Sequence, residues 1–323
     1  MKNIAVLTSG GDSPGMNACI RAVVRTCKYN GINAFGIMRG YQGMIEGDIK
    51  ELQSMDVSNI IQRGGTILKT ARSKEFRTPE GREKAYRNLI KHNIDGLVLI
   101  GGDGTCRGAV EFFKTYNIPA MATPGTIDND LAGSDYTIGF DTAINTAVEA
   151  IDKIRDTADS HDRIFIVEVM GRDAGYIALH SGLACGAENI LIPERRDTMQ
   201  EVIKRIADNT KRKKLMSIIV VAEGDELGGA MHVDKYLKEY FGNLDTRVSI
   251  LGHIQRGGSP SCADRILASR TGYAAVMGLL QGRSQEMVGV INDQIAYTPF
   301  TEVVKLRLPM KDDMMEMIKV LSS

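Results

Sequence analysis

Apolar runs that end in glycine-rich turns recur along this chain and set its predicted architecture. Asn3–Thr8, Gly96–Ile100 and Arg163–Val169 are short and predominantly apolar, which is typical of strands buried on both faces of a parallel sheet. Each run leads through a glycine-containing turn into a stretch with helical periodicity. The helices are expected to end near Tyr29, Tyr116 and Ala184, and the first of them to begin near Met16.

The remaining segments extend the same alternation. Further strands are predicted at Ala34–Arg39, 117–123, Ile190–Pro193 and Ser217–Ala222. Helices are predicted over Glu80–His92 and from about Phe140, and a glycine-rich loop is predicted around Tyr41. Strands that alternate with helices in both halves predict an α/β fold with two similar lobes, each a mostly parallel sheet flanked by helices.

Length and composition narrow the class of protein. The 323 residues correspond to about two domains. Lys plus Arg and Asp plus Glu number 40 each, so the charge balance points neither to nucleic acid nor to a membrane surface. No apolar span reaches the roughly 18 residues of a transmembrane helix. We therefore expect no nucleic-acid partner and no membrane partner.

The cysteines indicate a reducing compartment. The five residues Cys19, Cys27, Cys106, Cys185 and Cys262 are scattered and form no C-x-x-C pair. Isolated cysteines of this kind are typical of buried thiols in a cytoplasmic protein. The sequence therefore predicts cytoplasmic localisation and buried cysteines.

The segment PGTIDND at Pro124–Asp130 is the first candidate for chemistry. It follows an apolar run of strand character, and open α/β sheets bind ligands at the carboxyl ends of their strands. Asp128 and Asp130 lie two residues apart, so that one carboxylate can accept a hydroxyl proton while the other arranges metal or water. The alternative is a surface turn rich in Asx residues, since Thr126 and Asn129 can bond their own backbone.

Two glycine turns are candidates for binding phosphate. SGGDSPGMNA and GGDGT each join a buried strand to a helix, and free NH groups at a helix N-terminus favour phosphate oxygens. Asp103 in GGDGT is placed to hold Mg²⁺ against those oxygens. The alternatives are turns used for packing alone and Asp103 as a cap of its own helix.

A basic segment, QRGGTILKTARSKEFRTPEGR, separates these turns. Lys69, Arg72 and Arg77 in this segment are candidates for contacting a polyphosphate. The alternative is a solvated charged face, which is the common meaning of such a cluster.

Together these motifs resemble one family. GGDSPGMNA, GGDGT, PGTIDND, MGRDAG and LGHIQRGG occur in this order between residues 10 and 258, and the chain resembles bacterial 6-phosphofructokinase over essentially its whole length. The resemblance implies glycolytic, ATP-dependent phosphorylation of fructose 6-phosphate to fructose 1,6-bisphosphate, with Mg²⁺ as cofactor. It also implies an ATP-binding lobe over 1–138 with 256–305, and a sugar-phosphate-binding lobe over 139–255 with 306–323.

The resemblance assigns roles to individual residues. Asp128 is implied as the base, and Asp103 as the Mg²⁺ ligand. The catalytic set is implied to be Gly11, Arg72, Thr126, Asp128 and Arg172. The nucleotide set is implied to be Gly11, Tyr41, Arg72, Ser73, Asp103, Gly104, Thr105 and Gly108.

The sugar set includes residues that the resemblance places at a subunit interface. It comprises Thr126, Asp128, Asp130, Arg163, Met170, Gly171, Arg172, Glu223, Arg247, His253 and Arg256. Arg163 and Arg247 are implied to reach the sugar phosphate of a neighbouring subunit. This implies a homotetramer with shared sugar sites.

The resemblance also implies an effector site for ADP or phosphoenolpyruvate. The matching positions are Arg21, Arg25, Arg155, Glu188, Arg212 and Lys214. Ser54 and Asn59 depart from the family pattern, in which an arginine and an aspartate stand at these positions. The alternative for each cation taken alone is a solvated surface charge.

Two other functions remain open from the sequence. Pyrophosphate-dependent relatives typically carry an acidic residue at the position of Gly104 and a lysine at that of Gly125, so the two glycines favour ATP. A catalytically silent paralogue that binds metabolites is the other alternative. The retained Asp103, Asp128 and Arg172 argue against it.

Overall fold

The chain forms two compact units in the computed structural model. The structure describes residues 1–160, 163–195, 199–211, 216–226, 228–242 and 244–306, together with 317 and 320. Unit 1 comprises 1–127, 131–142 and 256–306, and unit 2 comprises 128–130, 143–255 and 307–323. The lobes expected from the sequence have similar bounds, except that 128–130 group with unit 2, whereas 139–142 and residue 306 group with unit 1. The assignment of ATP and sugar to the two lobes stays a prediction.

Unit 1 is built on a seven-stranded sheet. Its strand order is β11-β10-β5-β4-β1-β2-β3, and every neighbouring pair is parallel except β2–β3 and β10–β11. The strands are β1 (Asn3–Ser9), β2 (Asn33–Ile37), β3 (Ile49–Leu52), β4 (Gly96–Gly101), β5 (Ala120–Pro124), β10 (Glu286–Ile291) and β11 (Gln294–Pro299). The helices are α1 (Met16–Tyr29), α2 (Gly40–Glu46), α3 (Pro79–Lys91), α4 (Asp103–Phe113), α9 (Cys262–Leu280) and the short η1 (Glu75–Arg77).

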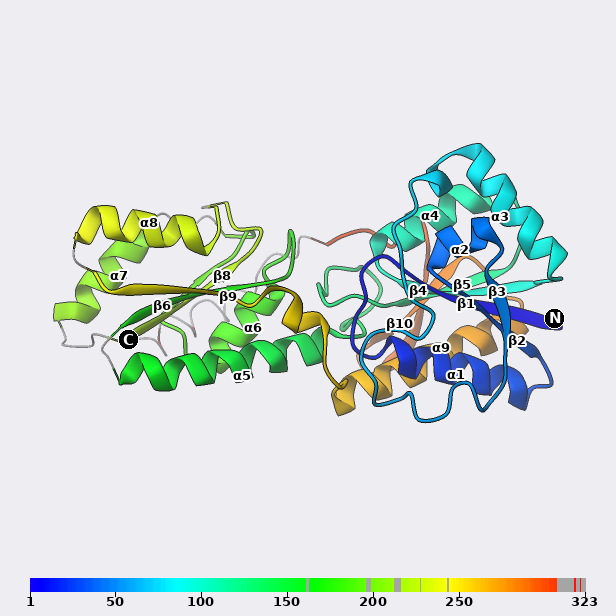
Figure 1. The fold of residues 1–323 in the computed structure, drawn as a ribbon, viewed down its shortest axis with the longest axis horizontal. Helices are drawn as coiled ribbons and strands as arrows, with labels where there is room; N and C mark the ends of the chain where they lie inside the picture. The colour runs from blue at the N-terminus through cyan, green and yellow to red at the C-terminus, as the bar shows by residue number, and fades with distance from the viewer. Residues whose placement is uncertain are drawn as a thin grey trace. The chain divides into compact units, whose positions relative to one another are not determined.

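Alternating side chains of the central strands build two cores in unit 1. Ile4 and Val6 of β1 pack with residues of α1 and α9 on one face, whereas Ala5 and Leu7 pack with residues of α2, α3 and α4 on the other. Figure 1 shows these two helix layers on opposite sides of the strands. Because both faces are covered, the central strands are apolar throughout, which is the pattern that predicted them.

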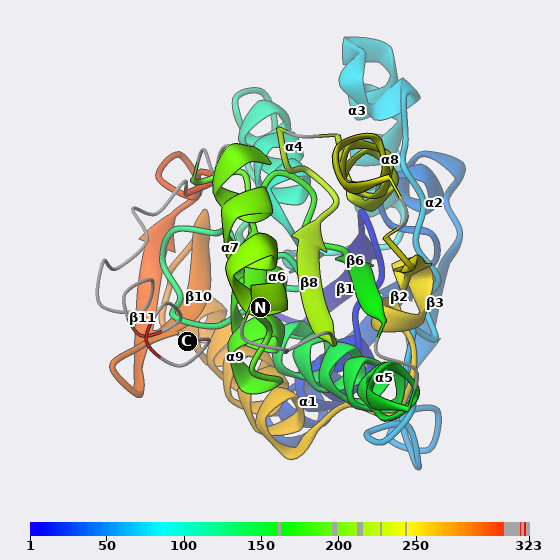
Figure 2. The ribbon, with the colours of Figure 1, turned by 90° about the vertical axis from the view of Figure 1, so that its left-hand side faces the viewer.

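Unit 2 is built on a four-stranded parallel sheet with the order β7-β8-β6-β9. The strands are β6 (Ile164–Val169), β7 (Asn189–Leu191), β8 (Ser217–Ala222) and β9 (Thr246–Ile250). The helices are α5 (Phe140–Asp159), α6 (Tyr176–Ala184), α7 (Met199–Lys211), α8 (Ala230–Phe241) and η2 (Gly252–Arg256), although the first three residues of α5 and the last residue of η2 group with unit 1. Helices α7 and α8 pack on one face of this sheet through an apolar cluster. In Figure 2 the paired strands β8 and β6 lie side by side.

The predicted α/β class and the paired lobes are confirmed, but some local predictions are wrong. Tyr41 lies in α2 rather than in a loop, because Arg39 and Gly40 adopt left-handed backbone angles that turn the chain into this helix. Strand β2 therefore ends at Ile37 and not at Arg39. Four cysteines are buried as expected, but Cys262 at the start of α9 is exposed. Among the described residues, no helix is both long and apolar enough to cross a bilayer.

Candidate functional site

The two glycine turns meet at the point where the order of the unit 1 strands reverses. β1 pairs with β2 on one side and with β4 on the other, and Ser9 of β1 lies opposite Gly101 of β4. The hydroxyl of Thr105 donates to the carbonyl oxygen of Ser9 at 3.2 Å and ties the two turns together. Ligands of open α/β sheets bind in the crevice at such a reversal. The geometry of unit 1 therefore supports a phosphate site between these turns.

Asp103 begins α4 and does not cap it. The N-cap residue is Gly102, which has no side chain to donate or accept a hydrogen bond. The Asp103 carboxylate is nearly buried and pairs with Arg107 one turn further along, at 2.8 Å. The described residues contain no group of three metal-binding side chains. Mg²⁺ in kinases binds one or two carboxylates together with substrate phosphates, so the single Asp103 carboxylate fits the ion.

Gly104 and Gly108 of the predicted nucleotide set, and Gly125, which the sequence linked to the choice of donor, differ in their surroundings. A Cβ added at Gly104 would have no atom within 4 Å, so a ligand has room to approach the backbone there. A Cβ at Gly108 would lie 2.9 Å from the Tyr41 ring, and one at Gly125 would lie within 3.2 Å of Ile100, Met16 and Gly101. Room for a nucleotide beside the backbone therefore has structural support at Gly104, whereas protein atoms crowd the Cβ position of Gly125, and the prediction for Gly125 stays a prediction.

Tyr41 and Ser73 have structural partners. The Tyr41 ring stacks on Phe76 with centroids 4.0 Å apart, and its hydroxyl donates to the carbonyl oxygen of Thr105 at 2.7 Å. Burial raises the pKa of Tyr41 well above its usual value. The Ser73 hydroxyl donates to Gln42 and accepts from the backbone N–H of Phe76. Both side chains therefore shape the loop that carries Arg72.

Arg72 itself is exposed. Within the described ranges its guanidinium makes no hydrogen bond or ion pair. The segment before it is fixed, because the Asn17 side chain bonds the backbone of residues Arg63, Gly64 and Ile67. An unpaired arginine on an anchored segment is suited to charge-assisted bonds with phosphate.

The PGTIDND segment leaves unit 1 at the end of β5. Ile138 donates its backbone N–H to the carbonyl oxygen of Pro124 at 2.8 Å, and the Thr137 hydroxyl donates to the carbonyl oxygen of Thr126 at 2.7 Å. Asp128 and Asp130 are each 4% exposed, so the alternative of an exposed surface turn does not describe them. Asn129 between them has a left-handed backbone with φ of 53°, which Asx residues tolerate.

Arg256 contacts the first glycine turn within unit 1. Its Nη1 atom donates to the carbonyl oxygen of Asp12 at 3.0 Å, and a Cβ on Gly11 would lie 2.9 Å from the same atom. The sequence places Gly11 in the nucleotide set and Arg256 in the sugar set. Their proximity was not predicted, because 245 positions separate them in the chain.

The sugar residues of unit 2 gather at the carboxyl ends of β6 and β8. Gly171 has φ of 143° and Arg172 has φ of 56°. Arg172 donates its backbone N–H to the Glu223 carboxylate at 2.8 Å, and Met170 donates to the side chain of Gln255 at 2.8 Å. A left-handed arginine costs conformational energy and is concentrated at binding sites. The contact supports a common role for Arg172 and Glu223, while Gln255 is a supporting residue that the sequence did not single out.

Arg163 and Arg247 converge on one carboxylate in unit 2. Arg163 pairs with Asp245 at 2.7 Å, and Arg247 pairs with the same side chain. The hydrogen bond and the two positive charges hold the pKa of the Asp245 carboxyl below its usual value. His253 in η2 is exposed. The structure thus brings the two arginines together, since Arg163 immediately precedes β6 and Arg247 lies in the neighbouring strand β9.

Asp130 belongs to a small polar group of unit 2. Burial raises the pKa of the Tyr176 hydroxyl to about 12, and the nearby carboxylates of Glu194 and Asp130 contribute. The Glu194 carboxylate accepts the backbone N–H of Gly175 at 2.8 Å, at the start of α6. An acidic side chain therefore already covers this helix N-terminus.

The predicted effector residues differ in their availability. Arg21 and Arg25 lie four apart on α1, and in the described part of the chain neither has a hydrogen-bond or ion-pair partner. Arg155 donates to the carbonyl oxygens of Cys185 and Gly186, and the buried Glu188 accepts the backbone N–H of Ile218 at 2.7 Å. Arg212 and Lys214 lie outside the described residues.

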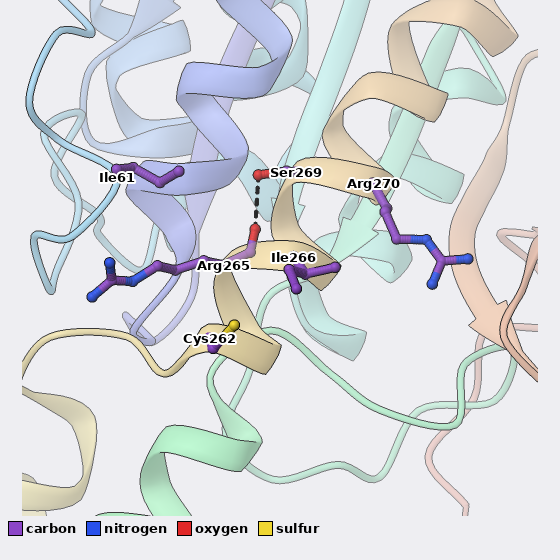
Figure 3. Close-up of a pocket in the computed structure, with 6 residues that line it drawn as sticks. All are labelled: Ile61, Cys262, Arg265, Ile266, Ser269 and Arg270. Atoms are coloured by element: carbon purple, nitrogen blue, oxygen red, sulfur yellow. Dashed lines mark hydrogen bonds between the residues drawn. The ribbon is translucent and has the colours of Figure 1, made fainter.

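A separate hollow of about 560 Å³ lies along α9. Figure 3 shows the six residues that line it, Ile61, Cys262, Arg265, Ile266, Ser269 and Arg270. Arg270 pairs with Asp293, and Arg265 donates to the carbonyl oxygen of Pro260 at 2.8 Å. None of the predicted site residues lines this hollow.

Comparison with known proteins decides the family. The family model described as phosphofructokinase matches residues 3–279. The ATP-dependent 6-phosphofructokinase of Cytophaga hutchinsonii is 55% identical over 322 residues, which cover 100% of this chain and 98% of that protein. The corresponding protein of Bacillus subtilis is 53% identical with full coverage of both chains. The chain belongs to the phosphofructokinase family.

Solved structures agree with this phosphofructokinase fold. Phosphofructokinase from Saccharomyces cerevisiae matches with a TM-score of 0.88 and 39% identity over 94% of this chain, which spans 45% of the yeast chain. A pyrophosphate-dependent phosphofructokinase from Marinobacter aquaeolei matches with a TM-score of 0.85 over 100% of this chain and 92% of its own. Its 24% identity supports the fold alone.

Proposed function

We propose that this phosphofructokinase transfers the γ-phosphoryl group of ATP to the 1-hydroxyl of fructose 6-phosphate in glycolysis. The observation that carries the proposal is the identity of 52% or more, over the full chain, to bacterial relatives named ATP-dependent 6-phosphofructokinase. The open backbone at Gly104 supports ATP as donor, because a bulky nucleotide has room there.

In the proposed mechanism Asp128 accepts the proton of the 1-hydroxyl as the oxygen attacks the γ-phosphorus, and ADP leaves. A carboxylate needs no raised pKa for this task and contributes on the order of 10²–10⁴-fold. Arg72 and Arg172 neutralise the charge that spreads over the phosphoryl oxygens during in-line transfer. Asp130, Thr126, Met170, Gly171, Glu223, His253 and Arg256 orient the sugar.

In this proposal Asp103 would hold Mg²⁺, and the bound ion would supply neutralisation of phosphate charge. The Arg107 guanidinium, which pairs with Asp103 at 2.8 Å, has to give up this contact or share the carboxylate. The pair is exposed on the arginine side, so it is worth only a few tenths of a kcal/mol, roughly 0.3–0.5, and offers little resistance.

Turnover with alternative donors tests the function. We expect fructose 1,6-bisphosphate to form from fructose 6-phosphate with MgATP and not with pyrophosphate. Turnover with pyrophosphate alone would indicate the pyrophosphate-dependent activity. Absence of turnover with both donors, in folded protein that still binds sugar phosphate, would indicate a silent paralogue.

Arg163 and Arg247 are proposed to bind the sugar phosphate of a neighbouring subunit in a homotetramer. Their guanidiniums lie together around Asp245, which gives the pair a common direction for a phosphate. Mass measurement in solution checks the tetramer. A mixture of Asp128→Asn and Arg247→Ala subunits should be more active than either variant alone, because shared sites recombine intact residues.

Effector control is expected to be weak. Arg21 and Arg25 are available for a phosphate, but Ser54 stands where the family pattern has an arginine. The charge-assisted contact that such an arginine makes is worth about 1.5–3 kcal/mol. This is roughly a tenfold loss or more in effector affinity. Titration of ADP and phosphoenolpyruvate against the sugar saturation curve measures it. Tight control that survives replacement of both Arg21 and Arg25 by alanine would place the effector site elsewhere.

A further inference from the structure

Asp264 is a buried carboxylate to which neither the motifs nor the proposed mechanism gives a role. It lies in the first turn of α9 and is 1% exposed. Its oxygens accept the backbone N–H of Gly139 at 2.7 Å and of Thr142 at 2.8 Å, as well as the Thr142 hydroxyl at 2.5 Å. Among the described residues no lysine or arginine forms an ion pair with it.

These donors belong to the start of α5. Gly139 immediately precedes this helix and has no side chain to cap it. Asp264 supplies the missing acceptor from α9, and its negative charge lies at the positive end of the helix dipole. A further hydrogen bond joins the starts of α5 and α9, because the backbone N–H of Ser261 donates to the Thr142 hydroxyl at 2.9 Å.

The same turn continues directly to the end of β5. The backbone N–H of Ile138 bonds Pro124 at 2.8 Å, and the Thr137 hydroxyl bonds Thr126 at 2.7 Å. Gly125 and Ile138 also form an isolated parallel bridge. Thr137 and Ile138, which directly precede Gly139, therefore hold the backbone of the segment that leads into Asp128.

The surroundings of Asp264 argue that it fixes a position more than it adds stability. Burial raises the pKa of its carboxyl above the usual value. To a lesser extent, the three hydrogen bonds lower this pKa and the Asp141 charge raises it. A buried carboxylate without a cation carries a desolvation penalty that hydrogen bonds only partly offset. Buried polar networks that satisfy their members specify one local geometry.

We propose that Asp264 is a positioning residue for catalysis, which holds the 137–142 turn against the end of β5 and so fixes Thr126 and the approach to Asp128. The inference rests on the proposed function, in which Asp128 is the base. Small displacements of a reacting group reduce rate strongly, since as little as about 1 Å costs on the order of 10²-fold. Looser anchoring of the 137–142 turn, through loss of hydrogen bonds to Asp264, is expected to lower kcat by about tenfold.

The test compares variants of the full chain. Asp264→Asn keeps the shape but removes the charge and one acceptor, and Thr142→Val removes the hydroxyl that bonds the same carboxylate. We expect kcat to fall about tenfold in Asp264→Asn and less in Thr142→Val, with KM for ATP within about twofold of the parent. Amide hydrogen exchange should rise within 137–142 and stay unchanged in β1.

Two matched controls separate positioning from general damage. Thr142→Ser keeps the hydroxyl and should restore parental kcat. Ser261→Ala removes the side-chain cap of α9, whose oxygen accepts the backbone N–H of Asp264 at 3.2 Å, while leaving the carboxylate in place. It should lower the melting temperature without the specific loss of kcat.

Three results would overturn the inference. The first is parental kcat in folded Asp264→Asn, and the second is an equal loss of kcat in Ser261→Ala. The third is loss of kcat without local change in exchange. Absence of turnover in the parent protein is a separate result, which would overturn the proposed function and the catalytic part of this inference with it.

Discussion

Asp128→Asn should lower kcat by about 10²-fold or more while the sugar still binds, because the amide keeps the shape of the side chain but accepts no proton. Asp128 is 4% exposed, so no bulk water can readily take over the proton. Initial rates over a range of fructose 6-phosphate concentrations measure the effect, with KM for the sugar expected to stay within about threefold.

Two other carboxylates provide controls for this change. Asp130→Asn alters the second carboxylate of the same loop and should retain more activity than Asp128→Asn. Asp95→Asn lies at the opposite end of the unit 1 sheet, where its carboxylate accepts the backbone N–H groups of Lys2 and Asn3. It should leave kcat unchanged. Near-parental kcat in purified Asp128→Asn would remove this residue from the role of base.

The sequence predicted the central strands because they are buried on both faces. β1, β4 and β8 match their predicted ranges to within a residue, since continuous apolar runs leave no other assignment. β9 and β10 were missed, as were the edge strands β3 and β11. Their exposed or partly exposed positions, such as Lys50 and Glu51, interrupt the apolar pattern. Antiparallel edge strands of this kind are defined by pairing with a neighbour and not by their own composition.

Site residues that act through long-range contacts were also beyond sequence reasoning. Ser261 and Asp264 form the S-x-x-D pattern of a helix start, and Ser261 does cap α9. Nothing local indicates that the Asp264 carboxylate turns instead to Gly139 and Thr142. The pair of Gly11 and Arg256 is a second example, because tertiary packing alone brings them together.

The glycines illustrate both the strength and the limit of motif reasoning. From the sequence, the glycines at 104, 108 and 125 make the same prediction, namely that a ligand or another part of the protein approaches the backbone closely. The structure distinguishes what approaches: open space at Gly104, the Tyr41 ring at Gly108, and core atoms at Gly125. Gly104 is therefore the position at which a substitution tests donor binding without disturbing protein packing.

Gly104→Asp should weaken use of ATP by about 10²-fold or more in kcat/KM. A carboxylate about 4 Å from a phosphate charge near a protein surface is opposed by roughly 4 kcal/mol, and each 1.4 kcal/mol is about tenfold. The backbone tolerates the side chain, because no protein atom lies within 4 Å of the added Cβ, so the melting temperature should stay close to that of the parent.

Gly104→Asn carries the same bulk without the charge, and Gly104→Ala only a methyl group. If repulsion of phosphate is the cause, the loss should follow the order Asp, Asn, Ala, and higher Mg²⁺ should partly relieve it. The sugar KM is the internal control, since Gly104 belongs to the proposed nucleotide set alone. An unchanged kcat/KM for ATP in Gly104→Asp, or an equal loss in Gly104→Asn, would show that no phosphate charge lies beside this position.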